Sequence, residues 1–220
     1  MSYKIEELQL KNFGIVGDFY CDQFSNINLI IGENGTGKTF LLKALYSAVK
    51  AMEEYKRGDD ISPMNDILSE KLRWTYQVDK LGDIVSKTAE DGLDFNMKMD
   101  KTYLEYQFSK SAASKVGIVG TSSNGKEGDS IFIPAKEVLS LFSVILKSRE
   151  IDKAFGFDDT YYDLAKALRI SPSLGKNYTV FANSRKVVSE VIDGKVDYDQ
   201  NSGKWYYKNK NKQKFSIGAT

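Results

Sequence analysis

The stretch Ile31 to Phe40, IGENGTGKTF, contains the residue types and the spacing needed to bind phosphate groups. Its glycines, lysine and threonine fit the pattern G-x-x-x-x-G-K-[ST], in which backbone N–H groups cradle phosphates. Lys38 is the candidate catalytic residue, because it should reach the β- and γ-phosphates, and Thr39 is a candidate Mg²⁺ ligand. The candidate phosphate-binding residues are Gly32, Glu33, Asn34, Gly35, Thr36, Gly37, Lys38, Thr39 and Phe40.

Two flanking segments must position this loop. Residues 26–32, NINLIIG, form a β-branched run of the length expected for a strand that is buried on both faces. Residues 39–52, TFLLKALYSAVKAM, place apolar residues at helical spacing without glycine or proline. A chance occurrence of the motif would require neither a strand before it nor a helix after it. The sequence therefore predicts a strand, a phosphate loop and a helix rather than a fortuitous glycine-rich turn.

The rest of the chain mixes strand-like and helix-like segments, which predicts an α/β protein. We expect one domain in four parts, residues 1–50, 51–133, 134–194 and 195–220. A hairpin is expected in residues 195–217, around the turn DQNSG. Helices are expected at residues 67–77, over most of 134–168 and at 184–194. The expected strands are residues 5–12, 15–20, 93–99, 102–109, 114–120 and 130–133.

Composition excludes several classes of protein and of site. The 220 residues are 41% apolar and 28% charged, as is ordinary for a globular protein. The chain contains no histidine, which excludes Ser-His-Asp triads, Cys-His nucleophiles and histidine metal sites. Its 31 basic and 30 acidic residues nearly balance, so contact with nucleic acid would need a local patch. One cysteine, no signal-peptide core and no apolar run of bilayer length predict a cytoplasmic protein with no membrane contact.

Several stretches resemble a known family. Residues 8–14, LQLKNFG, and residues 27–46, INLIIGENGTGKTFLLKALY, resemble the ABC-type ATPases of the SMC/RecF-like branch, including OLD-family proteins, often labelled AAA-family ATPases in bacterial genomes. Residues 131–141, IFIPAKEVLSL, and residues 157–165, FDDTYYDLA, resemble segments of bacterial ATPases found near anti-phage defence genes. The resemblance implies the N-terminal lobe of a P-loop NTPase, with a mixed β-sheet, a helical insertion, and ATP and Mg²⁺ as cofactors.

The resemblance also implies site residues outside the loop. Asn12 matches a family position near the adenine or phosphate edge of the site, and a polar residue at a strand end is the equally good alternative. Gln77 lies about forty residues beyond the loop, where the family has a glutamine that touches Mg²⁺ and the attacking water. The alternative for Gln77 is a surface residue on a helix.

The chain lacks other parts that such an ATPase needs. No apolar run is followed by Asp-Glu, and the switch histidine is absent. Residues 130–137, SIFIPAKE, begin like a Walker B strand but place proline and alanine where its carboxylates belong. We therefore expect residues 1–220 to be the first lobe of a longer protein, which on its own binds ATP or ADP weakly without turnover.

Charged residues elsewhere admit two interpretations. Residues 206–214, YYKNKNKQK, either track a nucleic-acid backbone or are solvated edge-strand lysines that discourage aggregation. Acidic pairs also occur along the chain, and we expect solvated loop and helix-cap residues rather than metal ligands. These pairs are Glu53-Glu54, Asp59-Asp60 and Asp158-Asp159.

Three functions are compatible with these observations. The first is an ATP-driven switch, in which a homodimer or larger assembly closes on nucleotide and controls an effector, such as a nuclease or another DNA-linked partner, in phage defence. The second is a non-hydrolysing nucleotide-binding module for regulation or assembly. The third is a phosphotransferase, which shares the loop but needs an acceptor site that the sequence does not identify.

Overall fold

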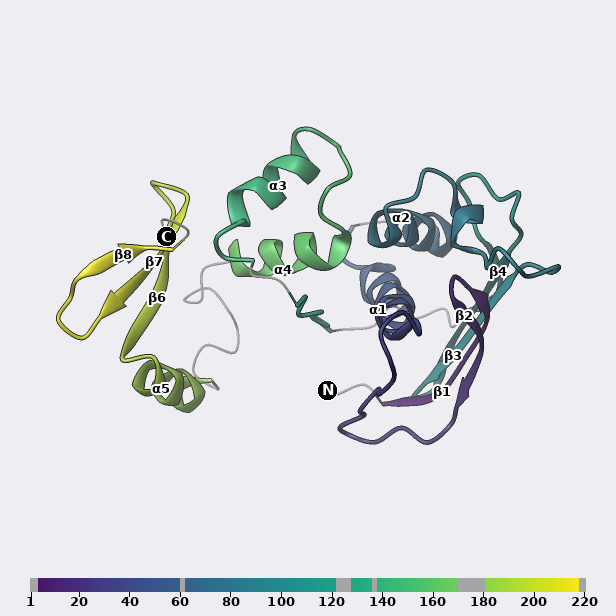
Figure 1. Ribbon diagram of the computed structural model, residues 1–220, viewed down its shortest axis with the longest axis horizontal. Coiled ribbons are helices and arrows are strands. Elements are labelled where there is room, and N and C mark those ends of the chain that lie inside the picture. Colours follow the sequence, from purple (N-terminus) through teal and green to yellow (C-terminus); the bar gives the residue numbers. More distant parts are fainter. Residues whose placement is uncertain (1–3, 60–61, 122–127, 136–137, 170–180, 218–220) are drawn as a thin grey trace. The chain divides into compact units, whose positions relative to one another are not determined.

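The computed structural model describes residues 4–59, 62–121, 128–135, 138–169 and 181–217. The chain divides into two compact units, unit 1 from Met1 to Ser130 and unit 2 from Ile131 to Thr220. Each unit has its own cluster of buried apolar side chains. The two units are therefore described separately (Figure 1).

Unit 1 is built on a five-stranded antiparallel sheet with the strand order β2-β1-β3-β4-β5. Apolar and polar residues alternate along the strands, so one face of the sheet is apolar. On that face, Leu10 pairs with Phe95, and Phe95 pairs with Tyr106 on the next strand. The strands are β1 (Ile5–Phe13), β2 (Val16–Cys21), β3 (Leu93–Met99), β4 (Thr102–Phe108) and β5 (Gly117–Thr121).

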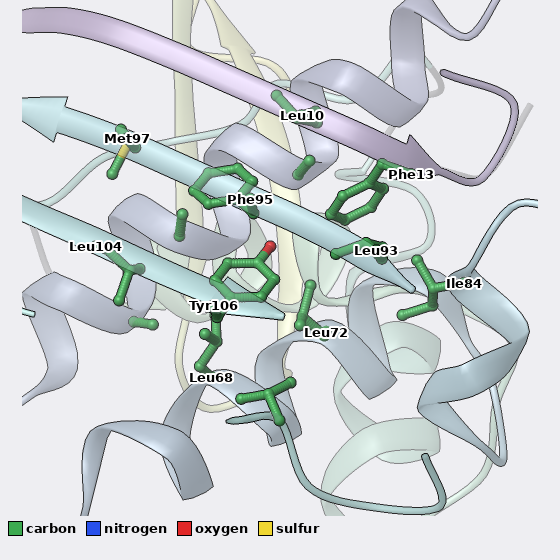
Figure 2. Close-up of a cluster of buried hydrophobic side chains, with 14 of the residues drawn as sticks. Leu10, Phe13, Leu68, Leu72, Ile84, Leu93, Phe95, Met97, Leu104 and Tyr106 are labelled. Carbon is green, nitrogen blue, oxygen red and sulfur yellow. The ribbon is translucent and has the colours of Figure 1, made fainter. Parts of the chain in front are cut away.

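Helices α1 (Lys38–Glu54) and α2 (Met64–Tyr76) and the 3-10 helix η1 (Leu81–Ile84) cover the apolar face (Figure 1). Figure 2 shows labelled side chains of β1, β3 and β4 in one cluster with Leu68 and Leu72 of α2. These side chains have almost no exposed surface, so their burial is the main stabilising term for unit 1.

Unit 2 combines helices with a separate three-stranded antiparallel sheet, in the order β6-β7-β8. Its core lies around Phe142, whose ring packs edge-on against Tyr198 and Trp205 at centroid distances of 5.1 and 5.8 Å. The elements are α3 (Phe142–Glu150), α4 (Asp159–Arg169), α5 (Ala182–Val191), β6 (Gly194–Asp199), β7 (Lys204–Asn209) and β8 (Lys214–Ser216).

Most of the expected elements are confirmed, and so is the α/β class. The predicted strand pair at residues 93–109 forms β3 and β4 with a turn at Asp100 and Lys101, as expected. The predicted helix at residues 39–52 is α1, and the predicted hairpin at residues 195–217 is β6 and β7. The hairpin sequence also contains a third strand, β8, which we did not predict.

The predicted buried strand at residues 26–32 is wrong. These residues form no strand, and Ile27, Leu29 and Ile31 are 88%, 82% and 82% exposed. No described strand lies beside them, so their backbone groups have no ladder partner. Asn28 instead folds back on Ser25, accepting a hydrogen bond from its N–H at 3.0 Å and donating one to its carbonyl at 2.8 Å. The described sheets are therefore antiparallel throughout, without the parallel part expected of a mixed sheet.

Two further predictions near the start of unit 2 are wrong. Residues 130–133 form no strand, and the Ser130 N–H donates to the Glu53 carboxylate rather than to a neighbouring strand. The helix expected from Pro134 begins only at Phe142, after turns at residues 139–141. Residues 136–137 lie outside the described residues. Val138 is buried beside Phe142, which explains why the apolar spacing resembled a helix that starts earlier.

Candidate nucleotide-binding site

The loop that precedes α1 depends on glycines at two positions. Gly35 and Gly37 have φ angles of 82° and 93°, in the left-handed region that other residues rarely adopt. Gly37 also needs its small size, because a Cβ there would lie 2.7 Å from Ile15 Cγ2 and 2.9 Å from Val16 Cγ2. A Cβ on Gly35 would meet nothing within 4 Å. The loop therefore packs against the start of β2 at Gly37 and is open at Gly35.

The tip of the loop is a turn closed by Thr36. Its hydroxyl donates to the carbonyl oxygen of Glu33 at 2.9 Å, and its N–H lies 3.5 Å from the same oxygen. A Cβ on Gly32 would lie only 2.9 Å from the Thr36 hydroxyl, which explains the need for glycine there. Residues 32–36 are all exposed. The turn thus presents its backbone to solvent.

Helix α1 begins with unsatisfied donors. Gly37 is its N-cap and provides no side-chain cap, and the first turn contains no acidic residue. The first intrahelical bond runs from the Leu41 N–H to the Gly37 carbonyl at 2.9 Å, so the preceding N–H groups have no intrahelical partner. These N–H groups and the helix dipole favour an anion at this end of α1. The Thr39 side chain in this turn is exposed.

The Lys38 ammonium group is directed at the loop itself. Its Nζ donates to the carbonyl oxygens of Gly32 at 2.7 Å and of Glu33 at 2.5 Å. Because both bonds are exposed, they can be exchanged for bonds to phosphate oxygens at little net change in free energy. Amide donors, a helix N-terminus and an ammonium group therefore lie together, and this set of donors fits a polyphosphate.

Asn12 and Gln77 are placed at the ends of elements. Asn12 has a φ of 55°, and its Nδ2 donates to the carbonyl oxygen of Gly92 at 2.9 Å. Gln77 ends α2 with a φ of 53°, and its N–H donates to the Arg73 carbonyl. Among the described residues, neither side chain has a hydrogen bond to the loop. Their roles toward a nucleotide therefore stay predictions, as do those of the loop residues.

A neighbouring aromatic cluster was missed by the sequence reasoning. The Tyr76 hydroxyl donates to the carbonyl oxygen of Phe40 at 2.8 Å, and the two rings lie 4.8 Å apart. The Phe40 ring lies against Gly14, and the Tyr76 ring also contacts Phe13 at 5.6 Å. The only signal in the sequence was the position of these aromatic and glycine residues beside the motif and beside Gln77.

Two acidic residues that we expected to be solvated are buried, which corrects that expectation. Glu53 accepts hydrogen bonds from the Ser130 N–H at 2.9 Å and from its hydroxyl at 2.7 Å. Asp159 lies 3.4 Å from the Arg149 guanidinium. The part of the chain that the structure describes contains no group of three or more acidic or cysteine side chains that could hold a metal ion.

One cavity of about 240 Å³ lies on the polar face of the unit 1 sheet. None of its lining residues belongs to the loop. The cavity is lined by Gln9, Lys11, Asp94, Phe95, Asn96, Glu105, Tyr106 and Gln107.

No helix within the described ranges has the length and apolar character needed to cross a bilayer.

Comparisons with known proteins add a family and two relatives. Residues 3–217 match the family described as AAA ATPase domain. Structural maintenance of chromosomes protein 6 of Dictyostelium discoideum is 24% identical over 203 residues, which cover 87% of this chain and 16% of that protein. The solved structure of the recombination mediator protein RecF with ATP, from the RecFOR pathway, aligns with a TM-score of 0.42 and 16% identity, over 89% of this chain and 60% of that one. The chain thus spans less than two thirds of either relative.

Proposed function

The chain belongs to the AAA ATPase domain family, and we propose that residues 32–40 hold the phosphates of ATP together with Mg²⁺. The observation that carries this proposal is the uncapped N-terminus of α1, which directly follows the left-handed Gly37 and begins with Lys38. Because the family match extends over residues 3–217, we also propose that both units belong to one ATPase domain.

Lys38, Thr39 and the first turn of α1 have specific roles in this proposal. Lys38 Nζ gives up its hydrogen bonds to the two loop carbonyl oxygens and donates to the β- and γ-phosphate oxygens instead. The N–H groups of the first turn of α1 donate to the phosphates, and the exposed Thr39 hydroxyl is a Mg²⁺ ligand. Bound ATP supplies a transferable γ-phosphoryl group. To take part, Asn12 would have to release the Gly92 carbonyl. For Gln77 we propose the role of a Mg²⁺ ligand.

We propose binding without turnover for the 220-residue chain. Hydrolysis needs a group that orients or activates water, and the sequence has no apolar run followed by Asp-Glu. The sequence that comes closest to such a run begins at residues 130–133. These residues form no strand that could direct carboxylates at the loop. A non-hydrolysing nucleotide-binding module is therefore the alternative function supported by the same observation.

In a larger assembly, we propose that nucleotide binding closes two copies of the domain and controls a DNA-linked effector such as a nuclease. The exposed apolar residues Ile27, Leu29 and Ile31 support the need for further protein beside the loop, because they alternate as in a strand. A role in phage defence is suggested only by the resemblance of residues 131–141 and 157–165 to defence-associated ATPases.

A calorimetric titration with Mg-ATP, with phosphate release followed in the same samples, tests the proposal. We expect binding by the unchanged chain, no binding by Lys38→Ala, and no steady phosphate release. Lys87→Ala is the matched control, because Lys87 is an exposed lysine of unit 1 outside the loop. Absence of binding by the unchanged chain would refute the nucleotide site. Steady phosphate release that depends on Lys38 would refute binding without turnover.

A further inference from the structure

The three-stranded sheet of unit 2 has two faces of different chemistry. One face contains apolar side chains, and Trp205 of β7 on this face lies 5.1 Å from Tyr198 of β6 and packs on Phe142. Because side chains alternate along a strand, the neighbours of Trp205 face the other way. That opposite face, here called the lysine face, contains Lys195, Asp197, Asp199, Lys204, Tyr206, Lys208, Lys214 and Ser216.

Three lysines are directly opposite one another on the lysine face. Lys195 of β6 pairs with Lys208 of β7, and Lys208 pairs with Lys214 of β8. Since adjacent strands lie about 4.8 Å apart, this row extends across roughly 10 Å. Like charges directly opposite one another destabilise a sheet. The row therefore opposes folding, and some other property of these lysines must explain their position.

Protection of sheet edges explains only part of the row. Lysines on edge strands prevent pairing with other chains, and this accounts for Lys195 on β6 and Lys214 on β8. However, β7 is the central strand, so Lys208 and Lys204 protect no edge. The interpretation of residues 206–214 as edge-strand lysines therefore fits Lys214 but is wrong for Lys208. A surface that binds an anion explains Lys204 and Lys208 on the central strand. A surface that only prevents pairing with other strands does not.

The acidic residues of the sheet do not neutralise this face. Lys195 pairs with Asp197 at 2.5 Å, and Lys214 lies 3.3 Å from Asp199. Lys208 has no acidic partner within 4 Å among the described residues. Residues 193–217 contain six lysines and three aspartates, an excess of three positive charges in a chain whose total charge is only +1. Positive charge is therefore concentrated here.

An aromatic side chain lies in the next row of the same face. Tyr206 pairs with Asp197 and Ser216, next to the three lysines. The Lys214 ammonium lies 3.7 Å from the centre of the Tyr206 ring, a cation–π contact. A ring flanked by lysines is the combination with which proteins stack bases of a single strand while binding its phosphates.

We propose that the lysine face binds single-stranded nucleic acid, with Lys195, Lys208 and Lys214 at the phosphates and Tyr206 against a base. The surface lies outside the ATP loop, so its binding is measured without nucleotide and is independent of the proposed function. An anionic protein segment would satisfy the lysines but would leave the ring without a stacking partner.

The experiment measures fluorescence anisotropy of a labelled 20-nucleotide oligothymidylate with the 220-residue chain over a salt series. We expect the triple variant Lys195→Gln, Lys208→Gln and Lys214→Gln to bind at least tenfold more weakly. The slope of log K against log salt should become shallower by about 2, since each phosphate contact on a single strand contributes about 0.7. Thermal unfolding of the same samples shows whether the triple variant is folded.

A charge-matched control separates this surface from general attraction. Lys147→Gln, Lys153→Gln and Lys186→Gln remove three lysines from unit 2 outside the sheet. This control should retain binding, and an equal loss in both triple variants would overturn the proposal. Displacement of the oligonucleotide by polyglutamate at equal charge would instead assign the surface to an acidic protein. If the triple variant does not fold, Lys208→Gln alone should make the slope about 0.7 shallower.

The stacking contact is tested separately. Tyr206→Phe should bind like the unchanged chain, whereas Tyr206→Leu should bind about fivefold to tenfold more weakly with an unchanged salt slope. Equal binding by the two variants would overturn the role of the ring. Equal affinity for a duplex of the same length would overturn the preference for a single strand.

Discussion

The Tyr76 hydroxyl donates a hydrogen bond of 2.8 Å to the carbonyl oxygen of Phe40, which links the end of α2 to the first turn of α1. Phe40 directly follows Thr39 and lies at the end of α1 that contains the unsatisfied donors. Tyr76 directly precedes Gln77, the candidate metal ligand. The bond therefore connects the two segments that the nucleotide proposal brings together, and we infer that Tyr76 is a positioning residue for the loop.

Tyr76→Phe keeps the ring and removes the hydroxyl that donates this bond. We expect Mg-ATP affinity to fall about threefold to tenfold and the free energy of unfolding to fall by about 1 kcal/mol. Calorimetry and urea unfolding of the same samples give both values. Tyr103→Phe, on the exposed side of β4, should change neither. Unchanged affinity in Tyr76→Phe would show that the bond supports only the fold.

Gly14 and Phe40 form the second contact behind the loop. Gly14 has a φ of 59°, and a Cβ there would lie 2.2 Å from Phe40 Cε1. Gly14→Ala should therefore reduce the free energy of unfolding by about 2–4 kcal/mol through backbone strain and overpacking. Adding Phe40→Leu should restore part of the loss, because the ring is removed and only the strain remains.

Gly17→Ala is the matched control for this prediction. Gly17 is also in the β1–β2 region, but its φ is not in the left-handed range and a Cβ there meets nothing within 4 Å. Urea unfolding should show a change below about 0.5 kcal/mol. A similar loss in both alanine variants would mean that the contact with Phe40 does not determine the effect.

The elements that were predicted correctly are those whose signal lies within a few neighbouring residues. The alternation in residues 93–109 was sufficient for β3, β4 and their turn, and apolar helical spacing was sufficient for α1. The left-handed angles at Gly35 and Gly37 are compatible with the glycines of the motif, because glycine adopts such angles without steric cost. These signals are contained within a few neighbouring residues.

The wrong predictions concern partners that are distant in sequence. Residues 26–32 have strand composition, but a strand needs a neighbour, and no described strand lies beside them. Burial of Glu53 depends on Ser130, 77 residues away, and no local pattern indicates that pair. Tyr76 and Phe40 are 36 residues apart, so their hydrogen bond could not be predicted from the motif alone.

The Glu53 carboxylate is 1% exposed and has three partners. It accepts bonds from the Ser130 N–H and hydroxyl and lies 3.2 Å from Lys50 Nζ. Glu53→Gln removes the negative charge and leaves the mostly buried Lys50 without its pair, so we expect a loss of about 2–4 kcal/mol in urea unfolding. Glu6→Gln, at an exposed position of β1, should lose less than about 0.5 kcal/mol. Equal losses would contradict the special role of Glu53.

Tyr106 places a hydroxyl in the core of unit 1, among the carbon side chains shown in Figure 2. Its oxygen has no hydrogen-bond partner among the described residues. Because an unpaired buried hydroxyl is unfavourable, Tyr106→Phe should increase the free energy of unfolding by about 1 kcal/mol at pH 8. A loss of stability in this variant would show that the hydroxyl has a partner, such as a buried water molecule.

The same hydroxyl makes stability depend on alkaline pH. Burial raises the pKa of Tyr106 well above its ordinary value of 10.0. The folded state therefore keeps its proton when the unfolded chain loses one, so this tyrosine reduces stability as the pH rises above 10. The phenylalanine variant has no hydroxyl to ionise. In urea unfolding, the difference between its free energy of unfolding and that of the unchanged chain should therefore increase between pH 9 and pH 11. A constant difference across this range would mean that Tyr106 ionises equally in both states.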